Sequence, residues 1–389
     1  MKTETAKVPP HRRPGGRIAF LLPTLEGGGA ERVVLNLLKE MSAAGIPLDL
    51  VLVAAHGAFL DQIPETVRVV DLHSQRVAGA VMPLCRYLRQ SRPSVLISNM
   101  SHVNTIACLA KMLTRNRTAV ICVEHAQFGD HLGGREKAIR GLARWLYPTA
   151  DAVVAVSRGA ALSVETAIKA MRGKVHVIYP PVVDEALLAE AEAPLEHPWL
   201  DGEIPVFLTV CRLSAQKDFS TLLNAFQCLR RQRQARLLIL GEGPSREALE
   251  AQVSALDLSE DVAMPGFTPN PYAYMRRADA FVLSSRSEGL GLVLIEAMAC
   301  GCPVVATDCP SGPREILEGG RFGALVPVGD AAALSGAMCR ALDAPLPAEQ
   351  LRRRAMDFSA ARAAKAFLDL AAHLTGTPGG PGGARQENC

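Results

Sequence analysis

Arg212 and Lys217 are the first residues whose types and spacing indicate chemistry. They stand five residues apart, at the end of an apolar run that begins at Val206. A planar guanidinium and a compact ammonium on one loop can hold a diphosphate between them. The alternative for this pair is two solvated surface charges, which is the usual situation of an Arg and a Lys.

Two glutamates follow further along the chain. Glu288 lies in a glycine-containing loop after the apolar run 279–285, and Glu296 comes eight residues later in the stretch VLIEAMA. An unpaired carboxylate in such an apolar helix is costly, so we expect Glu296 to accept hydrogen bonds, and a ribose diol is a suitable donor. The alternative is that Glu288 caps a helix and Glu296 has a buried structural role.

Glycine turns occupy two further strand-to-helix junctions. Gly27, Gly28 and Gly29 follow the run 17–23, and the GEGP turn at 241–244 follows an apolar run that begins at 235. Glycine lets the backbone approach a ligand closely, and the free amides of a helix start attract a diphosphate. Either turn can also be a tight junction without a ligand. The first turn lacks the GxGxxG spacing of a dinucleotide site.

Apolar runs alternate with helical patterns through both halves of the chain, which is typical of parallel sheets covered on both faces. The first half predicts strands at 17–23, 48–55, 67–72, 94–99, 119–125, 151–157 and 175–180. The second half predicts strands at 206–213, 235–243, 261–267, 279–285, 303–308 and 323–328. We therefore expect an α/β protein in which two Rossmann-like domains face a cleft, with ligands at the carboxyl ends of the strands.

The 389 residues divide into six predicted segments. Residues 1–16 and 375–389 are polar and rich in Pro and Gly, and we expect disordered tails there. The acidic, proline-containing stretch 184–203 is expected to link an N-terminal Rossmann-like domain, 17–183, to a C-terminal one, 204–347. A helical segment, 348–374, follows and is expected to cross back to the first domain.

Composition excludes several classes of protein. The 42 Lys and Arg and 39 Asp and Glu give a net charge of +3, which is too balanced for a nucleic-acid binder. No apolar run reaches the roughly 20 residues that span a bilayer, and no signal peptide is expected at the start. The ten cysteines are scattered, and Cys300, Cys302 and Cys309 lack zinc-site spacing, so free thiols in a reducing compartment are expected.

In combination these motifs resemble the family 4 retaining glycosyltransferases, which have the GT-B fold. Glu288 and Glu296 match the E-x7-E pattern of that family. The other matching motifs occur in the same order: a Gly-Gly-x-Glu turn ending at Glu31, the Arg212 and Lys217 pair, the 241–244 turn and the PGF segment at 265–267. The resemblance spans roughly residues 17–374 and is more specific in the second half.

The resemblance implies a role for each motif. Arg212 and Lys217 would hold the donor diphosphate, Glu296 would bind the ribose, and Glu288 would lie against the donor sugar. Further donor contacts are implied for Gly28, Gly29, Gly266, Phe267, Gly289, Leu290, Gly291 and Leu292. His125, in the stretch CVEHAQF, matches a histidine beside the donor sugar, and a partly buried loop histidine is the alternative.

The implied reaction moves a hexose or N-acetylhexosamine from a nucleotide diphosphate sugar, with UDP expected, to a glycan or lipid-linked acceptor held by the first domain. Such a reaction belongs to cell-surface polysaccharide or glycolipid assembly. The segment 310–315 is similar to a subgroup that uses UDP-activated N-acetylhexosamines or hexoses. Because the sequence has no Asp-x-Asp motif, Arg212, Lys217 and helix N-termini are expected to meet the leaving charge without a metal or other cofactor.

Other functions stay open on the sequence alone. An NAD-dependent oxidoreductase would also have Rossmann-like domains, although GxGxxG with an acidic residue about 20 positions later does not occur. A sugar-nucleotide epimerase of GT-B fold would share the donor, and an inactive binding protein would keep the fold without turnover. Assays of glycosyl transfer, C2 epimerisation and donor hydrolysis distinguish these functions.

A basic amphipathic pattern at 135–147 suggests where the acceptor is met. Apolar residues recur at helical spacing, namely Ile139, Leu142, Ala143 and Leu146. A basic stripe beside them consists of Lys137, Arg140 and Arg144. Two aromatic residues, Trp145 and Tyr147, suit a membrane interface. Lys111, Arg115 and Arg117 extend the basic surface. We expect a cytoplasmic protein attached peripherally to an anionic membrane surface, and the alternative is a core-packed helix with a solvated basic face.

Overall fold

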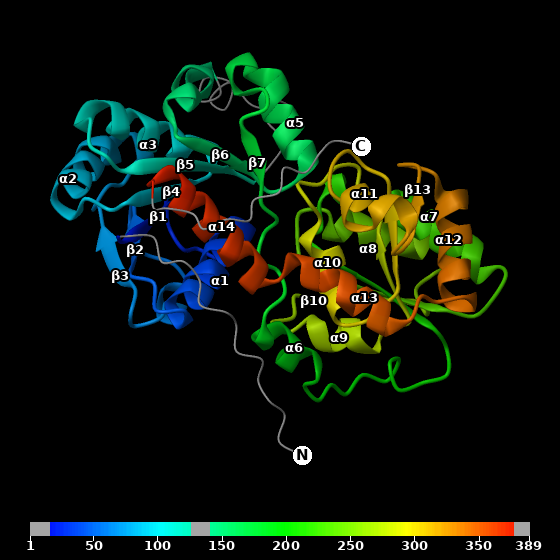
Figure 1. Cartoon of the computed structure of the whole chain (residues 1–389). Coiled ribbons are helices and arrows are strands. Elements are labelled where there is room, and N and C mark those ends of the chain that lie inside the picture. The colour runs from blue at the N-terminus through cyan, green and yellow to red at the C-terminus, as the bar shows by residue number, and fades with distance from the viewer. Residues whose placement is uncertain (1–15, 126–140, 377–389) are drawn as a thin grey trace. The chain divides into compact units, whose positions relative to one another are not determined.

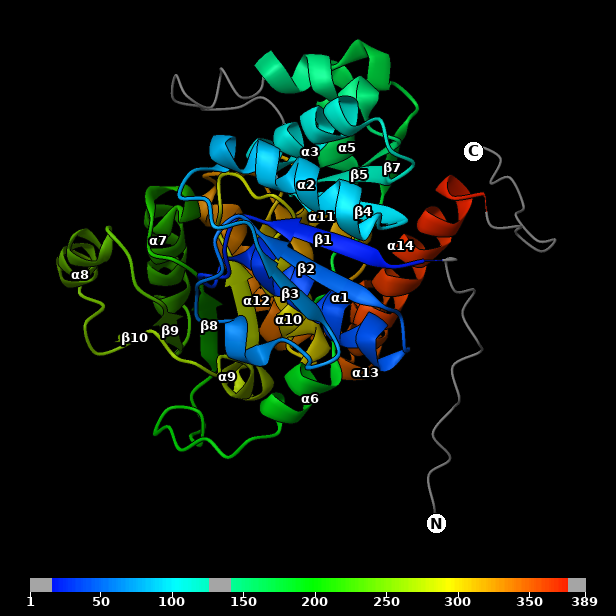
Figure 2. The ribbon, with the colours of Figure 1, turned by 90° about the vertical axis from the view of Figure 1, so that its left-hand side faces the viewer.

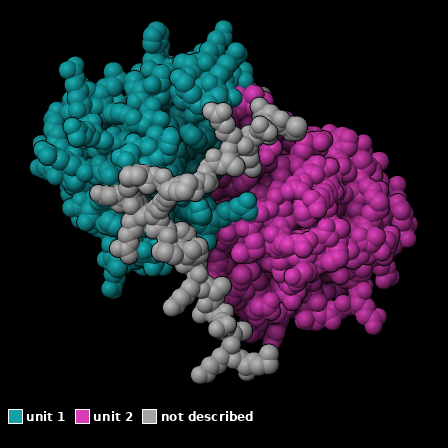
Figure 3. All heavy atoms as spheres, in the orientation of Figure 1, with its two compact units in different colours: residues 1–155, 164–178, 361–389 teal, residues 156–163, 179–360 magenta. Residues whose placement is uncertain are grey.

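The computed structural model describes residues 16–125 and 141–376 (Figure 1). The chain separates into two compact units, which Figure 3 shows in different colours. Unit 1 comprises the described parts of residues 1–155, 164–178 and 361–389, and unit 2 comprises residues 156–163 and 179–360. The expected tails, 1–16 and 375–389, fall almost entirely outside the described residues.

Unit 1 is built on a parallel sheet with the strand order β3-β2-β1-β4-β5-β6-β7. Every predicted strand of the first half is present, with slightly shorter bounds: β1 Ile18–Leu22, β2 Leu48–Leu52, β3 Arg68–Asp71, β4 Val95–Asn99, β5 Ala119–Glu124, β6 Ala152–Ala155 and β7 Val175–Val177. The strands β1, β2, β4, β5 and β6 are buried along their whole length. Burial on both faces explains why they are continuous apolar runs.

The helices of unit 1 cover both faces of this sheet. They are α1 (Gly29–Ala43), α2 (Val81–Ser91), α3 (Ser101–Thr114), α5 (Arg158–Ala167), of which residues 164–167 belong to unit 1, and α14 (Ala360–Leu374). Helices α2 and α3 lie side by side on one face, as Figure 2 shows. Their apolar sides share one core with β4, β5 and the short helix at 141–146.

Unit 2 repeats the architecture with the strand order β10-β9-β8-β11-β12-β13, and all neighbouring strands are parallel. Its strands are β8 Val206–Val210, β9 Arg236–Leu240, β10 Val262–Gly266, β11 Ala280–Leu283, β12 Val304–Thr307 and β13 Ala324–Val326. Its helices are α6 Glu185–Ala191, α7 Phe219–Arg230, α8 Arg246–Ala255, α9 Tyr272–Arg277, α10 Leu292–Ala299, α11 Pro313–Ile316, α12 Ala331–Asp343 and α13 Ala348–Ala355.

The predicted segment boundaries and the two units differ in several places. Residues 156–163 and 179–183, predicted in the N-terminal domain, belong to unit 2. The stretch 184–203, expected as a linker, lies inside unit 2 and begins with α6. The Asp184 side chain caps this helix by accepting from the Leu187 N–H at 2.8 Å, and Leu187 and Ala191 are buried in the core of unit 2. The C-terminal segment 348–374 divides, because α13 packs in unit 2 while residues from Ala361 onward return to unit 1.

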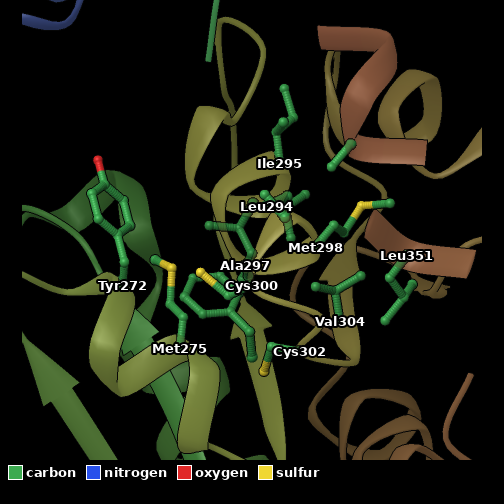
Figure 4. Packing of buried hydrophobic residues seen from close by; sticks show 14 of the residues in the cluster. Tyr272, Met275, Leu294, Ile295, Ala297, Met298, Cys300, Cys302, Val304 and Leu351 are labelled. Atoms are coloured by element: carbon green, nitrogen blue, oxygen red, sulfur yellow. The ribbon is translucent and has the colours of Figure 1, made fainter. Parts of the chain in front are cut away.

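Helix α10 is the most apolar helix beside the candidate site. Leu294, Ile295, Ala297 and Met298 are completely buried, and Leu351 of α13 belongs to the same cluster (Figure 4). Cysteines 300, 302 and 309 are buried free thiols, and burial raises the pKa of Cys300 and Cys309 to about 12. Such packing fixes the start of α10, and with it the loop that carries Glu288.

Candidate active site

The candidate site of unit 2 lies where the strand order of its sheet reverses. Strand β8 is central, with β9 and β10 on one side and β11, β12 and β13 on the other. The loops after β8 and β11 therefore leave the sheet as neighbours and diverge toward opposite faces, which opens a crevice for a ligand. The first loop carries Arg212 and Lys217, and the second carries Glu288.

Lys217 and Glu288 form an ion pair across this crevice. The Lys217 Nζ atom lies 2.6 Å from Glu288 Oε1, and the two side chains are only 17% and 11% exposed. Ser285 Oγ donates to the same carboxylate oxygen at 2.6 Å. The structure thus brings together two of the predicted catalytic residues, which are 71 positions apart in the sequence.

Further polar contacts hold the same two loops together. Gln216 Nε2 donates to the Ser287 carbonyl at 2.6 Å, and the Arg286 N–H donates to the Gln216 carbonyl at 2.9 Å. Asp218, whose backbone is left-handed with a φ of 50°, pairs with Arg286 at 3.1 Å. These bonds are made by the residues that flank Lys217 and Glu288 in the sequence. They fix the backbone of both loops, so the fold positions the Lys217 ammonium.

Arg212 differs from Lys217 in being exposed. It makes no ion pair with any carboxylate in the described part of the chain, although it follows β8 directly. An exposed guanidinium at the carboxyl end of a central strand keeps all five of its donors for a ligand. The predicted pair therefore consists of one cation held by Glu288 and one cation that remains open to solvent.

The GEGP turn has a structural explanation. A side chain at Gly241 would place its Cβ 1.9 Å from the Cys211 carbonyl oxygen, and one at Gly243 would lie 2.2 Å from the Leu213 carbonyl oxygen. The Leu213 N–H also donates to the Glu242 carbonyl at 2.9 Å. These glycines let the turn pack directly on the backbone that carries Arg212, which favours the structural interpretation over a direct ligand role.

The loop 289–292 is shaped by contacts that sequence analysis missed. Ser311 Oγ donates to the Gly289 carbonyl at 2.7 Å, and a Cβ at Gly312 would lie 2.0 Å from the Leu290 carbonyl oxygen. Gly291 has a φ of 87° and precedes the first residue of α10, Leu292. Leu290 itself is buried at 3% exposure, so its side chain anchors the loop. The carbonyls point to the 311–312 turn, and the first amides of α10 lack partners within the helix.

Three further residues predicted to contact the donor belong to unit 2: Glu296, Gly266 and Phe267. Glu296 is half-buried on α10. Gly266 has a φ of 94°, and a Cβ there would lie 2.9 Å from Glu242 Oε1. Phe267 is 76% exposed, an uncommon state for a large aromatic residue.

The glycine turn of unit 1 has an internal anion. Both the Gly27 N–H, at 2.6 Å, and the Gly28 N–H, at 3.0 Å, donate to Glu31 Oε2, and Glu31 is almost completely buried. This cap by the Glu31 carboxylate explains the Gly-Gly-x-Glu spacing. The Gly28 amide donates to Glu31 in this arrangement. The amide of Gly29, the first residue of α1, remains at the open end of the helix.

His125 follows β5 and contacts the end of β4. Its Nε2 lies 3.0 Å from Oδ1 of Asn99, a buried residue that sequence analysis did not select. Burial lowers the pKa of His125 to about 4, so the imidazole is neutral near pH 7. An imidazole that donates from Nε2 to Asn99 keeps Nδ1 as an acceptor. Asn99 stands at the carboxyl end of β4, beside the point where the strand order of unit 1 reverses. This position in the sequence could have indicated Asn99 as a site residue.

A buried carboxylate supports the same strand end. Glu124 is 2% exposed and accepts hydrogen bonds from Ser101 Oγ at 2.7 Å, from Asn104 Nδ2 at 3.0 Å and from the Tyr147 hydroxyl. Burial and the Glu124 charge hold the pKa of Tyr147 well above its usual value. Tyr147 is completely buried, so its predicted place at a membrane interface is wrong.

The rest of the predicted basic helix is described only in part. Residues 135–140 lie outside the described residues, and these include Lys137, Ile139 and Arg140. The remainder forms a helix at 141–146 that buries Ala143 and Leu146 and leaves Leu142 51% and Trp145 83% exposed. Arg144 is also exposed. Lys111 is tied to Asp151 in an ion pair, so it adds little to a basic surface.

Comparison with known proteins identifies the class to which this fold and site belong. The family model for glycosyl transferases group 1 matches residues 197–358, and the model for glycosyltransferase family 4 matches residues 27–186. The two matches leave only residues 187–196 between them. The chain belongs to the family 4 glycosyltransferases and has the GT-B fold.

Individual relatives agree with this assignment. One is the N-acetylgalactosamine-N,N'-diacetylbacillosaminyl-diphospho-undecaprenol 4-alpha-N-acetylgalactosaminyltransferase of Campylobacter jejuni, which is 29% identical over 366 residues, 90% of this chain and 95% of that protein. The amylovoran biosynthesis glycosyltransferase AmsD of Erwinia amylovora is 27% identical over 60% of this chain and 64% of its own length.

Solved structures share the fold at lower identity. The lipopolysaccharide outer core galactosyltransferase WaaB has a TM-score of 0.72 at 22% identity, covering 92% of this chain and 99% of that one. Anabaena HepE, solved in complex with UDP, has a TM-score of 0.75 at 21% identity, covering 92% and 100%. The protein is a glycosyltransferase, and several of its relatives are named for the assembly of polysaccharides, lipopolysaccharides or lipid-linked saccharides.

Proposed function

We propose that this glycosyltransferase moves a hexose or N-acetylhexosamine from a UDP-sugar to a lipid-linked or glycan acceptor, with retention of anomeric configuration. The observation that carries the proposal is the Lys217–Glu288 pair, with Arg212 on the same loop, at the point where the strand order of unit 2 reverses. Cations at that place suit a diphosphate, and a carboxylate beside them suits sugar hydroxyls.

In the proposed reaction the bond between C1 of the sugar and the diphosphate oxygen breaks while a bond forms between C1 and the acceptor oxygen. The leaving diphosphate takes the acceptor proton on the same face of the sugar. Arg212, Lys217 and the amides at the start of α10 stabilise the charge that develops on the diphosphate. We propose that these groups replace a metal ion, and that no side chain forms a covalent intermediate.

His125 is proposed to contact the donor sugar from unit 1. Because burial keeps its imidazole neutral, it can donate or accept a hydrogen bond without competing with Arg212 and Lys217 for the diphosphate. Asn99 fixes the ring by its contact with Nε2. In this proposal Gly29 and its neighbours in the α1 turn approach the diphosphate, while Glu31 keeps the turn in shape.

The lipid-linked acceptor is supported by the name of the Campylobacter jejuni relative, which specifies a diphospho-undecaprenol-linked substrate and an α-linked product. We propose that the protein works as a peripheral protein at the cytoplasmic face of a membrane. No described helix is both long and apolar enough to cross a bilayer. The exposed Trp145 and Arg144 are consistent with contact at a membrane surface.

A donor screen tests the proposal. The purified protein is incubated with UDP-N-acetylgalactosamine, UDP-N-acetylglucosamine, UDP-galactose and UDP-glucose, with a polyprenyl-diphosphate saccharide as acceptor, and UDP release and product are measured. We expect one UDP-sugar to be turned over and the product to be α-linked, as shown by its anomeric proton coupling. A β-linked product would contradict retention, and turnover of none of these UDP-sugars would contradict the donor.

A further inference from the structure

One face of unit 1 has an unusual charge distribution. Residues 72–123 include seven Lys and Arg but no Asp or Glu. The strands within this stretch, β4 and β5, are buried, and all but one of the seven basic residues lie on or shortly after α2 and α3. Figure 2 shows these two helices side by side. The six arginines of the stretch make no ion pair with a carboxylate among the described residues: Arg76, Arg86, Arg89, Arg92, Arg115 and Arg117.

The exposed side of α2 combines these charges with an apolar residue. Met82, Arg86 and Arg89 stand at i, i+4 and i+7, so they form one stripe along the helix, and all three are exposed. Met82 is 65% exposed. The stripe leads to Arg92, which ends the helix in a left-handed conformation with a φ of 43°.

A groove of about 700 Å³ lies at the end of this stripe. Its lining includes Arg89, Arg92 and Arg117, together with the polar side chains of Ser94, Asn116 and Thr118. Arg89 Nη2 donates to the Leu113 carbonyl at 3.4 Å, which joins the C-terminal ends of α2 and α3 at the groove. Three guanidiniums without carboxylate partners around one groove suit a phosphate group.

Apolar side chains stand next to these cations. Met112 and Leu113, at the end of α3, are 49% and 50% exposed, and the Leu113 carbonyl is the acceptor of Arg89. A soluble polyanion would use the arginines but would gain nothing from exposed methionine and leucine. A phospholipid surface uses both, because guanidiniums bind headgroup phosphates while apolar side chains enter the interfacial layer.

We propose that the ends of α2 and α3 dock on an anionic phospholipid membrane, with Arg89, Arg92 and Arg117 binding headgroup phosphates and Met112 and Leu113 entering the interface. The proposal extends the proposed function, in which the acceptor is membrane-borne. The groove lies at the amino ends of β4 and β5, since Ser94 and Thr118 precede these strands. His125 follows the opposite end of β5, so docking leaves that end accessible.

Vesicle co-sedimentation tests this surface. Vesicles of equimolar phosphatidylglycerol and phosphatidylcholine are compared with vesicles of phosphatidylcholine alone, at low and high salt. The triple variant Arg89→Gln, Arg92→Gln, Arg117→Gln should partition onto the anionic vesicles about 100-fold more weakly, because each basic residue near such a surface contributes about a factor of five. The matched control removes three exposed arginines from unit 2, Arg231→Gln, Arg340→Gln and Arg353→Gln, and should bind like the wild type.

The apolar residues are tested separately with Met112→Ser, Leu113→Ser. This variant should bind anionic vesicles at least several-fold more weakly while its retention on soluble polyphosphate stays unchanged. Equal losses in the arginine triple variant and its control would overturn the proposal, as would wild-type vesicle binding by the serine variant, which would indicate a soluble polyanion site. UDP release with a water-soluble acceptor should stay normal in all these variants. If the wild type itself releases no UDP, that result counts against the proposed function and not against the membrane surface.

Discussion

Replacement of Lys217 by alanine should reduce both turnover and stability, whereas replacement of Arg212 should reduce turnover alone. Lys217 is paired with Glu288 at 2.6 Å and is 17% exposed, while Arg212 is exposed and makes no ion pair with a described residue. Both cations are proposed to hold the leaving diphosphate. Only Lys217, however, is also part of the folded structure.

The magnitudes follow from burial. Loss of one partner of a fully buried ion pair costs about 3–5 kcal/mol, and an exposed pair contributes at most about 1 kcal/mol. Because the Lys217–Glu288 pair is mostly but not wholly buried, and Ser285 still donates to the carboxylate, we expect Lys217→Ala to cost about 2 kcal/mol. Tm should fall by about 4–8 °C. Arg212→Ala should change stability by less than about 0.5 kcal/mol.

Turnover and thermal unfolding are measured on the same preparations. Each single variant should lose about 2–4 kcal/mol of transition-state stabilisation, which is roughly 30- to 1000-fold in kcat/KM. The double variant Lys217→Met, Glu288→Gln should regain at least half of the stability that Lys217→Ala loses, because it no longer contains the buried carboxylate charge. Near-wild-type turnover by both single variants would refute the diphosphate assignment. Identical melting of Lys217→Ala and Arg212→Ala would refute the role of the pair in stability.

Four further outcomes are expected. Glu296→Gln should weaken UDP binding by about 1–3 kcal/mol with an unchanged Tm, whereas a lower Tm at unchanged affinity would show a structural role. Transfer should survive EDTA, and activity that is abolished by EDTA and restored by Mn²⁺ would contradict metal independence. Because burial lowers the pKa of His125 to about 4, the unfolded chain binds a proton that the folded chain excludes, so stability should fall between about pH 6.5 and 4, and His125→Gln should flatten this slope in urea titrations. Gly312→Ala should lower both Tm and donor affinity, because its Cβ would lie 2.0 Å from the Leu290 carbonyl oxygen, and unchanged affinity would detach this turn from the site.

The sequence by itself determined the two parallel sheets, because strands buried on both faces must be continuous apolar runs and helices must alternate with them. All the predicted strands are present with shorter bounds. The loop positions of Arg212, Lys217 and Glu288 also followed, since residues directly after a strand lie at the carboxyl edge of the sheet. These inferences depend only on local spacing, which the chain carries without its tertiary contacts.

Tertiary structure alone decided which partners these residues have. That Lys217 bonds to Glu288, that Glu31 occupies the amides of Gly27 and Gly28, and that Tyr147 is buried against Glu124 depend on segments distant in sequence or on backbone direction. A helical pattern shows that residues share a face, but it cannot show whether that face meets protein or solvent. For this reason the basic pattern at 135–147 was misjudged at Tyr147. The tertiary structure also decided that the exposed arginines of α2 and of the end of α3 lie beside one groove.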